Sequence, residues 1–120
     1  MARSEATGPR FERIALTYLR LRGLRLVERN FRCRGGEIDL IMRHDACLVF
    51  VEVRFRASSR FGSAAASVHA HKQARLIHAA QVFLSRSSQA LGTDCRFDVL
   101  AFEGSIRPVW IRNAFDASSE

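Results

Sequence analysis

Acidic side chains occur within two apolar segments that lie close together along the chain. Glu37 and Asp39 alternate with apolar residues in segment 36–43, and Glu52 stands between valines in segment 47–56. A free carboxylate is costly in apolar surroundings, so these groups need a charged partner. Carboxylate oxygens suit Mg²⁺ or Mn²⁺, and such a cation can activate water and neutralise a phosphodiester. The pattern therefore predicts a metal-dependent hydrolytic site that uses Glu37, Asp39 and Glu52.

A β-hairpin with its turn at residues 44–46 would bring these acidic residues together. In that register Asp39 lies opposite Glu52, and Glu37 lies opposite Arg54, all on one face. The other face is apolar and consists of Ile38, Leu40, Met42, Val49, Val51 and Val53. Opposed carboxylates repel each other, which favours a cation between them. The alternative is a solvated polar face on which Glu37 and Arg54 form an ordinary surface ion pair.

The sequence contains a single lysine, Lys72, within a helical pattern at residues 68–88. The apolar residues on its helical stripe are Val68, Leu76, Ala79, Ala80 and Phe83. An ammonium group on the face that packs against a sheet is unfavourable unless it meets a carboxylate or a phosphate. We therefore expect Lys72 to point toward Glu37, Asp39 or Glu52, with Gln73 nearby. The alternative is that Lys72 extends from the helix end into solvent.

The order Asp39, Glu52, Arg54 resembles the core motif of the PD-(D/E)xK nucleases, in which an Asp on one strand precedes Glu-x-Lys on the next. Over nearly the whole chain, the sequence is also similar to the YraN-like family of uncharacterised bacterial proteins. The residues that carry this similarity are Gly8, Glu12, Ala15, Tyr18, Leu19, Phe61, Gly62, Val68, Lys72 and Gln73, with segments 29–32, 36–41, 51–54 and 96–99.

This resemblance implies a restriction-endonuclease-like fold, similar to archaeal Holliday-junction resolvases, with Asp39 and Glu52 as metal ligands. It also implies that Glu12 approaches the metal, although by its position Glu12 is equally an ordinary residue beside an apolar stripe. Arg54 departs from the motif, because it occupies the position of the catalytic lysine. Arginine stays protonated and cannot act as a base, so Lys72 is the candidate that assists it.

The elements that must position these residues follow from periodicity and turn signals. We expect a helix that begins near residues 8–9, strands over 24–32, 36–43 and 47–56, a helix over 68–88, and strands over 96–102 and 106–112. Pro108 predicts that the last strand lies at a sheet edge. Segment 57–67 is expected to be a mobile loop, and 1–7 and 113–120 flexible tails. The order indicates a single α/β domain over 1–120, with a restriction-endonuclease-like αβββαβ core, a mixed central sheet flanked by helices, and one extra C-terminal strand.

Asp98 lies in the predicted strand over residues 96–102, on the same side as Arg96 and Leu100. It is either an outer partner of the acidic site or the partner of an arginine in a structural ion pair. Tyr18 and Trp110 are expected to pack in the core or at an edge rather than to stack on bases.

The composition sets broad limits on the class of protein. The 120 residues have a formal net charge of +7 and are 48% hydrophobic, which is typical of a globular domain. No apolar run is long enough to span a membrane, so we expect a cytoplasmic protein with no membrane partner. The excess of arginine agrees with phosphate contact or with a genome that favours arginine codons. The residues expected to contact nucleic acid are Arg56, Arg60, His69, Lys72, Gln73 and Arg75.

Together these features favour a metal-dependent DNA endonuclease that acts on branched or damaged DNA. Asp39, Glu52, Arg54 and Lys72 would carry catalysis, with Mg²⁺ or Mn²⁺ and no small-molecule cofactor, and a homodimer would suit a junction substrate. The alternative is a non-catalytic nucleic-acid-binding domain with a degenerate nuclease site. A third possibility is a protein-interaction module that needs no metal.

Overall fold

The computed structural model describes the backbone of residues 2–56, 68–87, 93–104 and 106–116. In chain order the elements are α1 (Ala2–Leu21), β1 (Arg25–Cys33), β2 (Gly36–His44), β3 (Cys47–Arg56), α2 (Ala70–Arg86), β4 (Cys95–Glu103) and β5 (Pro108–Phe115). Segment 57–67, expected to be a mobile loop, lies outside the described residues. Within the described ranges, no helix has the length and apolar character that a membrane crossing requires.

The five strands form one mixed sheet in the order β1-β2-β3-β4-β5. β1, β2 and β3 are antiparallel neighbours, β3 and β4 are parallel, and β5 is antiparallel to β4. Parallel neighbours need a crossover connection, and α2 lies in the chain between β3 and β4. The predicted α/β class, the αβββαβ order and the extra strand are therefore confirmed. Pro108 opens β5 at the sheet edge, as its missing N–H predicts.

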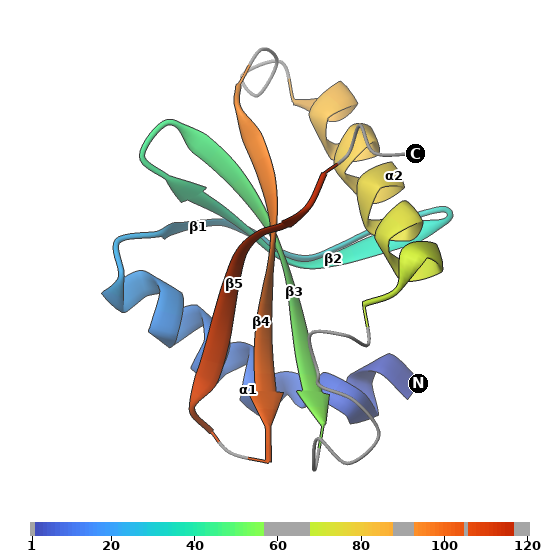
Figure 1. The fold of residues 1–120 in the computed structure, drawn as a ribbon. Helices are drawn as coiled ribbons and strands as arrows, with labels where there is room; N and C mark the ends of the chain where they lie inside the picture. The colour runs from blue at the N-terminus through green and yellow to red at the C-terminus, as the bar shows by residue number, and fades with distance from the viewer. Residues whose placement is uncertain (1, 57–67, 88–92, 105, 117–120) are drawn as a thin grey trace.

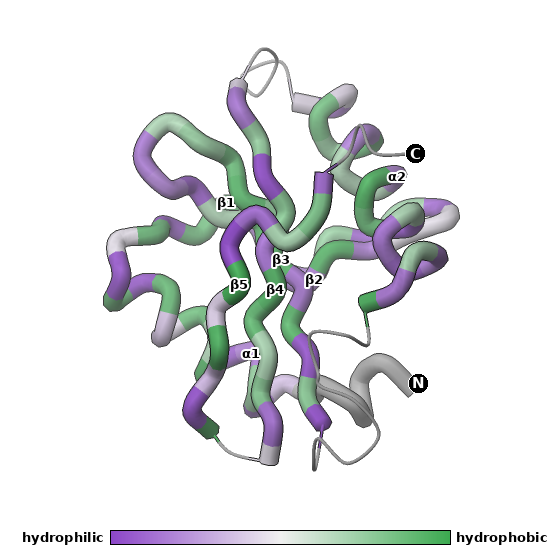
Figure 2. Tube along the Cα trace, viewed as in Figure 1, coloured by the Kyte–Doolittle hydropathy of each residue, from purple (hydrophilic) through white to green (hydrophobic). Residues whose placement is uncertain are grey.

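The two helices cover opposite faces of the sheet, and each face has its own core. Figure 1 shows α1 behind β3, β4 and β5, and α2 on the other side of the sheet. The core beneath α1 consists of Ala15, Leu16, Leu19, Leu24, Leu40, Met42, Val49, Val51, Val53, Leu100 and Phe102. The core beneath α2 consists of Phe31, Ile38, Ile41, Leu48, Phe50, Val68, Leu76, Ala79, Ala80, Phe83, Phe97, Val99 and Ala101. Because both faces of the sheet are covered, most of β4 is buried. Its lower half is accordingly coloured as mainly hydrophobic in Figure 2.

The predicted apolar face of the β2–β3 hairpin is confirmed except at Ile38. Five of the six residues predicted for it lie in the core beneath α1. Ile38 lies in the core beneath α2 instead, although simple alternation pairs it with Leu40. The regular β2–β3 pairing ends at Leu40 and Val51, so the alternation no longer holds before this point.

Helix α1 begins at Ala2 rather than near residues 8–9, and Pro9 lies inside it. Proline removes one backbone hydrogen bond from a helix interior. Of the seven residues of α1 that precede Pro9, two alanines, one arginine and one glutamate are strong helix formers, whereas Ser4, Thr7 and Gly8 are not, and the helix runs through all of them. Since β5 ends at Phe115, both terminal elements extend into the segments expected to be tails.

Strand β2 begins directly beneath α2, where there is no room for a side chain. A Cβ atom at Gly36 would overlap the carbonyl oxygen of Arg75 and lie 3.2 Å from the Ala79 Cβ. The obstructing oxygen is backbone, so α2 itself would have to move. Lys72 lies about one turn before Arg75 on the same helix. Gly36 therefore sets how closely α2, and with it Lys72, approaches the sheet.

This close approach predicts the effect of Gly36→Ala. We expect the free energy of unfolding to fall by about 2–3 kcal/mol, because the added methyl overpacks the contact. The resonance of the only lysine side chain should also shift as α2 moves. Urea unfolding and NMR of selectively labelled lysine measure both effects.

Gly23→Ala is the matched control. An added Cβ there meets nothing within 4 Å, and the cost comes only from the positive φ of +95°, about 1 kcal/mol. The lysine resonance should stay in place in this variant. An unchanged lysine resonance in Gly36→Ala would contradict the role assigned to Gly36.

Candidate functional site

The carboxylates of Asp39 and Glu52 meet where the β2–β3 ladder ends. Regular pairing runs from His44↔Cys47 to Leu40↔Val51, in the register expected from the sequence. One step further, the Asp39 Oδ2 atom accepts a hydrogen bond of 2.9 Å from the Val53 backbone N–H. The predicted meeting of Asp39 and Glu52 is thus achieved beside the ladder rather than as a regular ladder pair.

The Asp39 side chain takes the place of a backbone acceptor. In an antiparallel hairpin with a two-residue turn, the hydrogen-bonded pairs alternate outward from the turn. Continued regularly, this alternation would direct the Val53 N–H to the Ile38 carbonyl. The Asp39 carboxylate satisfies that N–H instead, so the two strands separate without leaving a buried donor unpaired.

Both carboxylates are buried, and burial dominates the ionisation of Glu52. Asp39 is 1% exposed and Glu52 2% exposed. Burial raises the pKa of Glu52 above its ordinary value of 4.5, while Lys72, Arg54 and a hydrogen bond with Asp39 act in the opposite direction. Asp39 and Glu52 are therefore two neighbouring carboxyl groups that are shielded from water.

Lys72 points at this pair from the first turn of α2. Its Nζ atom lies 3.5 Å from the Glu52 Oε2 atom, and its side chain is 22% exposed. The apolar stripe of α2 packs against the sheet through Leu76, Ala79, Ala80 and Phe83. This packing holds the helix over β1 and β2, and the contact with Glu52 confirms the hypothesis that Lys72 turns toward an acidic residue. The alternative, extension into solvent, is wrong.

Arg54 reaches the same oxygen atom as Lys72. Its NH1 atom lies 3.5 Å from the Glu52 Oε2 atom, from two positions further along β3. The expected opposition of Glu37 and Arg54 falls beyond the last regular β2–β3 pair, Leu40↔Val51, and stays a prediction. Glu37 forms an ion pair with Arg32 of β1, with the Arg32 Nε atom 3.6 Å from the Glu37 Oε1 atom.

The structure does not assemble Glu12 and Glu37 with Asp39 and Glu52 into the predicted four-carboxylate set. Among the described residues, no three His, Cys, Asp or Glu side chains are arranged so that they could hold a metal ion. Glu12 is buried, at 6% exposed, on α1, the helix on the face opposite to Lys72. Asp39 and Glu52 remain as a pair of hard oxygen donors. Such a pair fits Mg²⁺, which takes one or two carboxylates with waters and phosphate oxygens.

Four of the other residues expected near the site lie on or directly before the elements that carry Glu52 and Lys72, β3 and α2. Arg56 is exposed at the end of β3, and Arg75 is exposed on α2. Gln73 donates a hydrogen bond of 3.0 Å from Nε2 to the Val68 carbonyl oxygen, a contact that supports the start of α2. His69 is exposed at the N-cap of α2. Arg60 lies outside the described residues.

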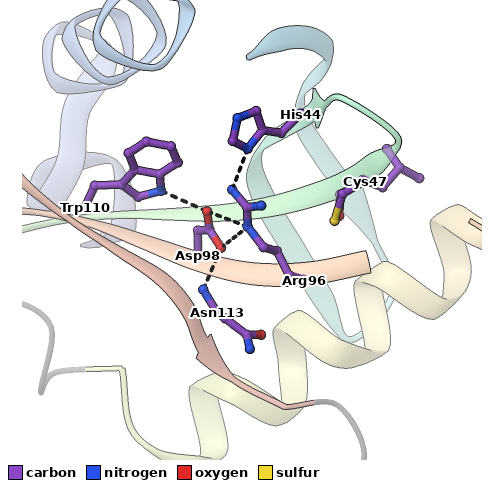
Figure 3. Close-up of polar contacts among 7 residues, drawn as sticks. His44, Cys47, Arg96, Asp98, Trp110 and Asn113 are labelled. Atoms are coloured by element: carbon purple, nitrogen blue, oxygen red, sulfur yellow. Dashed lines mark hydrogen bonds and ion pairs between the residues drawn. The ribbon is translucent and has the colours of Figure 1, made fainter. Parts of the chain in front are cut away.

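Asp98 lies on the other face of the sheet, so it is not an outer partner of the acidic site. It accepts hydrogen bonds from Arg96 Nε at 3.0 Å, from Trp110 Nε1 at 2.8 Å and from the Asn113 backbone N–H at 2.9 Å. Figure 3 shows these donors converging on the carboxylate, with His44 beyond Arg96. The predicted ion pair with an arginine and the packing role of Trp110 are confirmed. The Asn113 and His44 contacts had no signal in the sequence.

The raised pKa of Glu52 predicts the pH dependence of stability. Above pH 4.5 the unfolded chain ionises Glu52 while the folded protein still holds its proton. The folded state then binds more protons, so this residue's contribution to the free energy of unfolding falls as pH rises toward the raised pKa. Glu52→Gln should remove that slope. Urea unfolding from pH 4 upward measures the difference between the two proteins.

Glu28→Gln, at an exposed position of β1, is the matched control. Its free energy of unfolding should change with pH in parallel with that of the unsubstituted protein. A Glu52→Gln curve parallel to both would contradict the shifted titration.

Comparison with known sequences supports the similarity seen in the motifs. Residues 11–102 match the model of the uncharacterised protein family UPF0102. The UPF0102 protein of Janthinobacterium sp. (strain Marseille) is 54% identical over 86% of this chain and 81% of its own length. The relative from Saccharophagus degradans is 51% identical over 96% of this chain and 97% of its own. A third relative, from Nitrosococcus oceani, is 49% identical over 93% of this chain and 93% of its own length. The chain is therefore a member of the UPF0102 family.

Proposed function

We propose that this protein is a divalent-metal-dependent nuclease that hydrolyses phosphodiester bonds in DNA, with branched or damaged DNA as the substrate. The observation that carries the proposal is the buried pair Asp39 and Glu52, which meets two cationic side chains at one carboxylate oxygen. Burying two acids together is costly. Two carboxyl groups buried side by side are well suited to bind a divalent cation.

Asp39 and Glu52 would hold Mg²⁺ or Mn²⁺ at the end of the β2–β3 ladder. A bound cation supplies Lewis acidity, which activates water and neutralises charge on the phosphate. The Val53 N–H orients one of the ligands, because it fixes the Asp39 carboxylate by a hydrogen bond of 2.9 Å. The Val53 carbonyl oxygen is a candidate third ligand.

Arg54 and Lys72 would together replace the single catalytic lysine of the PD-(D/E)xK motif. The guanidinium of Arg54 can stabilise negative charge on the phosphate, but it stays protonated at neutral pH and cannot act as a base. Lys72 is the only lysine of the sequence, and its Nζ atom already lies 3.5 Å from the Glu52 Oε2 atom. When the metal occupies the carboxylates, Lys72 is free to turn toward the substrate phosphate.

The charge of the chain supports a polyanionic substrate. The formal net charge is +7, and exposed Arg56 and Arg75 lie on two of the three elements that form the site, β3 and α2. Arginine pairs with phosphate oxygens two at a time. These side chains would position the DNA backbone without reading its sequence.

The second candidate function is nucleic-acid binding without cleavage. It is favoured by one observation, that arginine replaces lysine at position 54 while Arg54 and Lys72 both contact Glu52. In that case the acidic pair has a purely structural role, and its cations neutralise it permanently.

Cleavage assays on linear, single-stranded and four-way-junction DNA test the proposal. We expect cutting with Mg²⁺ or Mn²⁺ that EDTA abolishes, and a loss of about 100-fold or more in Asp39→Asn. Lys72→Ala should lose about 10–100-fold, because one charge-stabilising group is removed. Arg54→Lys restores the motif and should keep or increase the rate.

Arg20→Ala removes the same type of charge from an exposed position of α1 and should leave cutting unchanged. Cutting that survives in Asp39→Asn would identify a contaminating nuclease. Salt-sensitive binding without cutting under either metal supports the second candidate function. Full activity in Lys72→Ala would exclude Lys72 from catalysis.

A further inference from the structure

A groove of about 490 Å³ lies between α1 and the start of β5. It is separate from the acidic site, because Lys72 approaches the sheet from the helix on the other face. The residues that line the groove are Arg10, Arg13, Ile14, Thr17, Tyr18, Leu21, Ile106 and Pro108. Its volume is within the range of ligand-binding clefts.

The apolar lining of the groove is unusually exposed. Leu21 is 78% exposed and Ile106 is 58% exposed. Among the described residues, only four large hydrophobic side chains are exposed, and two of them, Leu21 and Ile106, line this groove. Concentrated exposed aliphatic surface is typical of a contact site for another molecule.

The charges on the groove have one sign. Both charged lining residues, Arg10 and Arg13, are arginines one turn apart on α1, and no described acidic residue lines the groove. A partner that complements this lining must carry negative charge beside aliphatic groups. Two surfaces of this kind would bring their arginines together, so a second copy docked by the same groove is disfavoured.

Nucleic acid fits this lining less well than a peptide does. A strand of nucleic acid needs open aromatic faces for its bases. The one aromatic side chain in the groove is Tyr18, and the Arg22 guanidinium lies 3.5 Å from the centre of its ring. The remaining contact surface comes from Ile14, Leu21 and Ile106, which pack best against aliphatic side chains.

We propose that the groove between α1 and β5 docks an acidic, aliphatic-rich peptide segment of another protein. The arginines at positions 10 and 13 pair with its carboxylates, while the exposed aliphatic residues cover its apolar side chains. The proposal does not rest on nuclease activity, because the groove and the acidic site share no residue.

NMR titration of the full chain tests this inference. The probe is the capped peptide Glu-Leu-Asp-Ile-Glu-Leu, and we expect the methyl resonances of Ile14, Leu21 and Ile106 to shift. The double variant Arg10→Glu, Arg13→Glu should bind about fivefold more weakly or worse, because two ion pairs become repulsive. Arg25→Glu, Arg29→Glu makes the same change in net charge at exposed positions of β1 and should bind normally.

Comparison probes decide the remaining outcomes. A peptide with lysine in place of each acid, and one with serine in place of each aliphatic residue, should leave the methyl resonances unchanged. Equal shifts with either peptide would overturn the proposal, as would no shift with the acidic aliphatic peptide. Stronger shifts with a ten-nucleotide thymidine strand, or with vesicles that contain phosphatidylglycerol, would reassign the groove to nucleic acid or to membrane surfaces.

Discussion

The hydrogen bond from the Val53 N–H to the Asp39 carboxylate is the contact on which the acidic site depends. It lies where the β2–β3 ladder ends, and it satisfies a buried donor that the ladder no longer pairs. The strands can therefore separate at this point. The separation leaves the Asp39 and Glu52 carboxyls beside each other in a buried space.

Helix α2 adds Lys72 to the acidic site from the face of the sheet opposite to α1. Its apolar stripe and the close contact at Gly36 hold the helix against β2, and the first turn then places Lys72 at Glu52. Two cations at one carboxylate oxygen offset part of the cost of burial, although desolvation remains the larger effect on the pKa of Glu52. On the opposite face, Asp98 is neutralised by Arg96 and tied to β5 by Trp110. The sheet thus separates the acidic pair of Asp39 and Glu52 from the structural ion pair of Asp98 and Arg96.

Local patterns predicted most of the fold and half of the site. The bounds of β3 agree with the predicted strand, and the hairpin register is correct because a two-residue turn and one buried face admit few alternatives. Long-range pairing decided what local pattern left open. Glu37 forms an ion pair with Arg32 of β1. The alternation of side chains along a strand does not identify which strand lies beside it, so this partner was not predicted. For Asp98 the sequence left two alternatives, and the parallel pairing of β4 with β3 decides between them, because it places Asp98 on the opposite face, where it pairs with Arg96.

By itself, the sequence determined the element order, the register of the hairpin and the unusual placing of Lys72 on an apolar stripe. These follow from periodicity, turn length and the cost of a buried charge, which are local properties of the chain. Only the tertiary structure decided which charged side chains meet. The distance of α2 from the sheet, the separation of β2 and β3 and the face on which a side chain lies all depend on residues far apart in sequence. The sequence showed that Lys72 lies on an apolar helical stripe. Its partner, Glu52, is identified only by the packing of α2 on the sheet over β1 and β2.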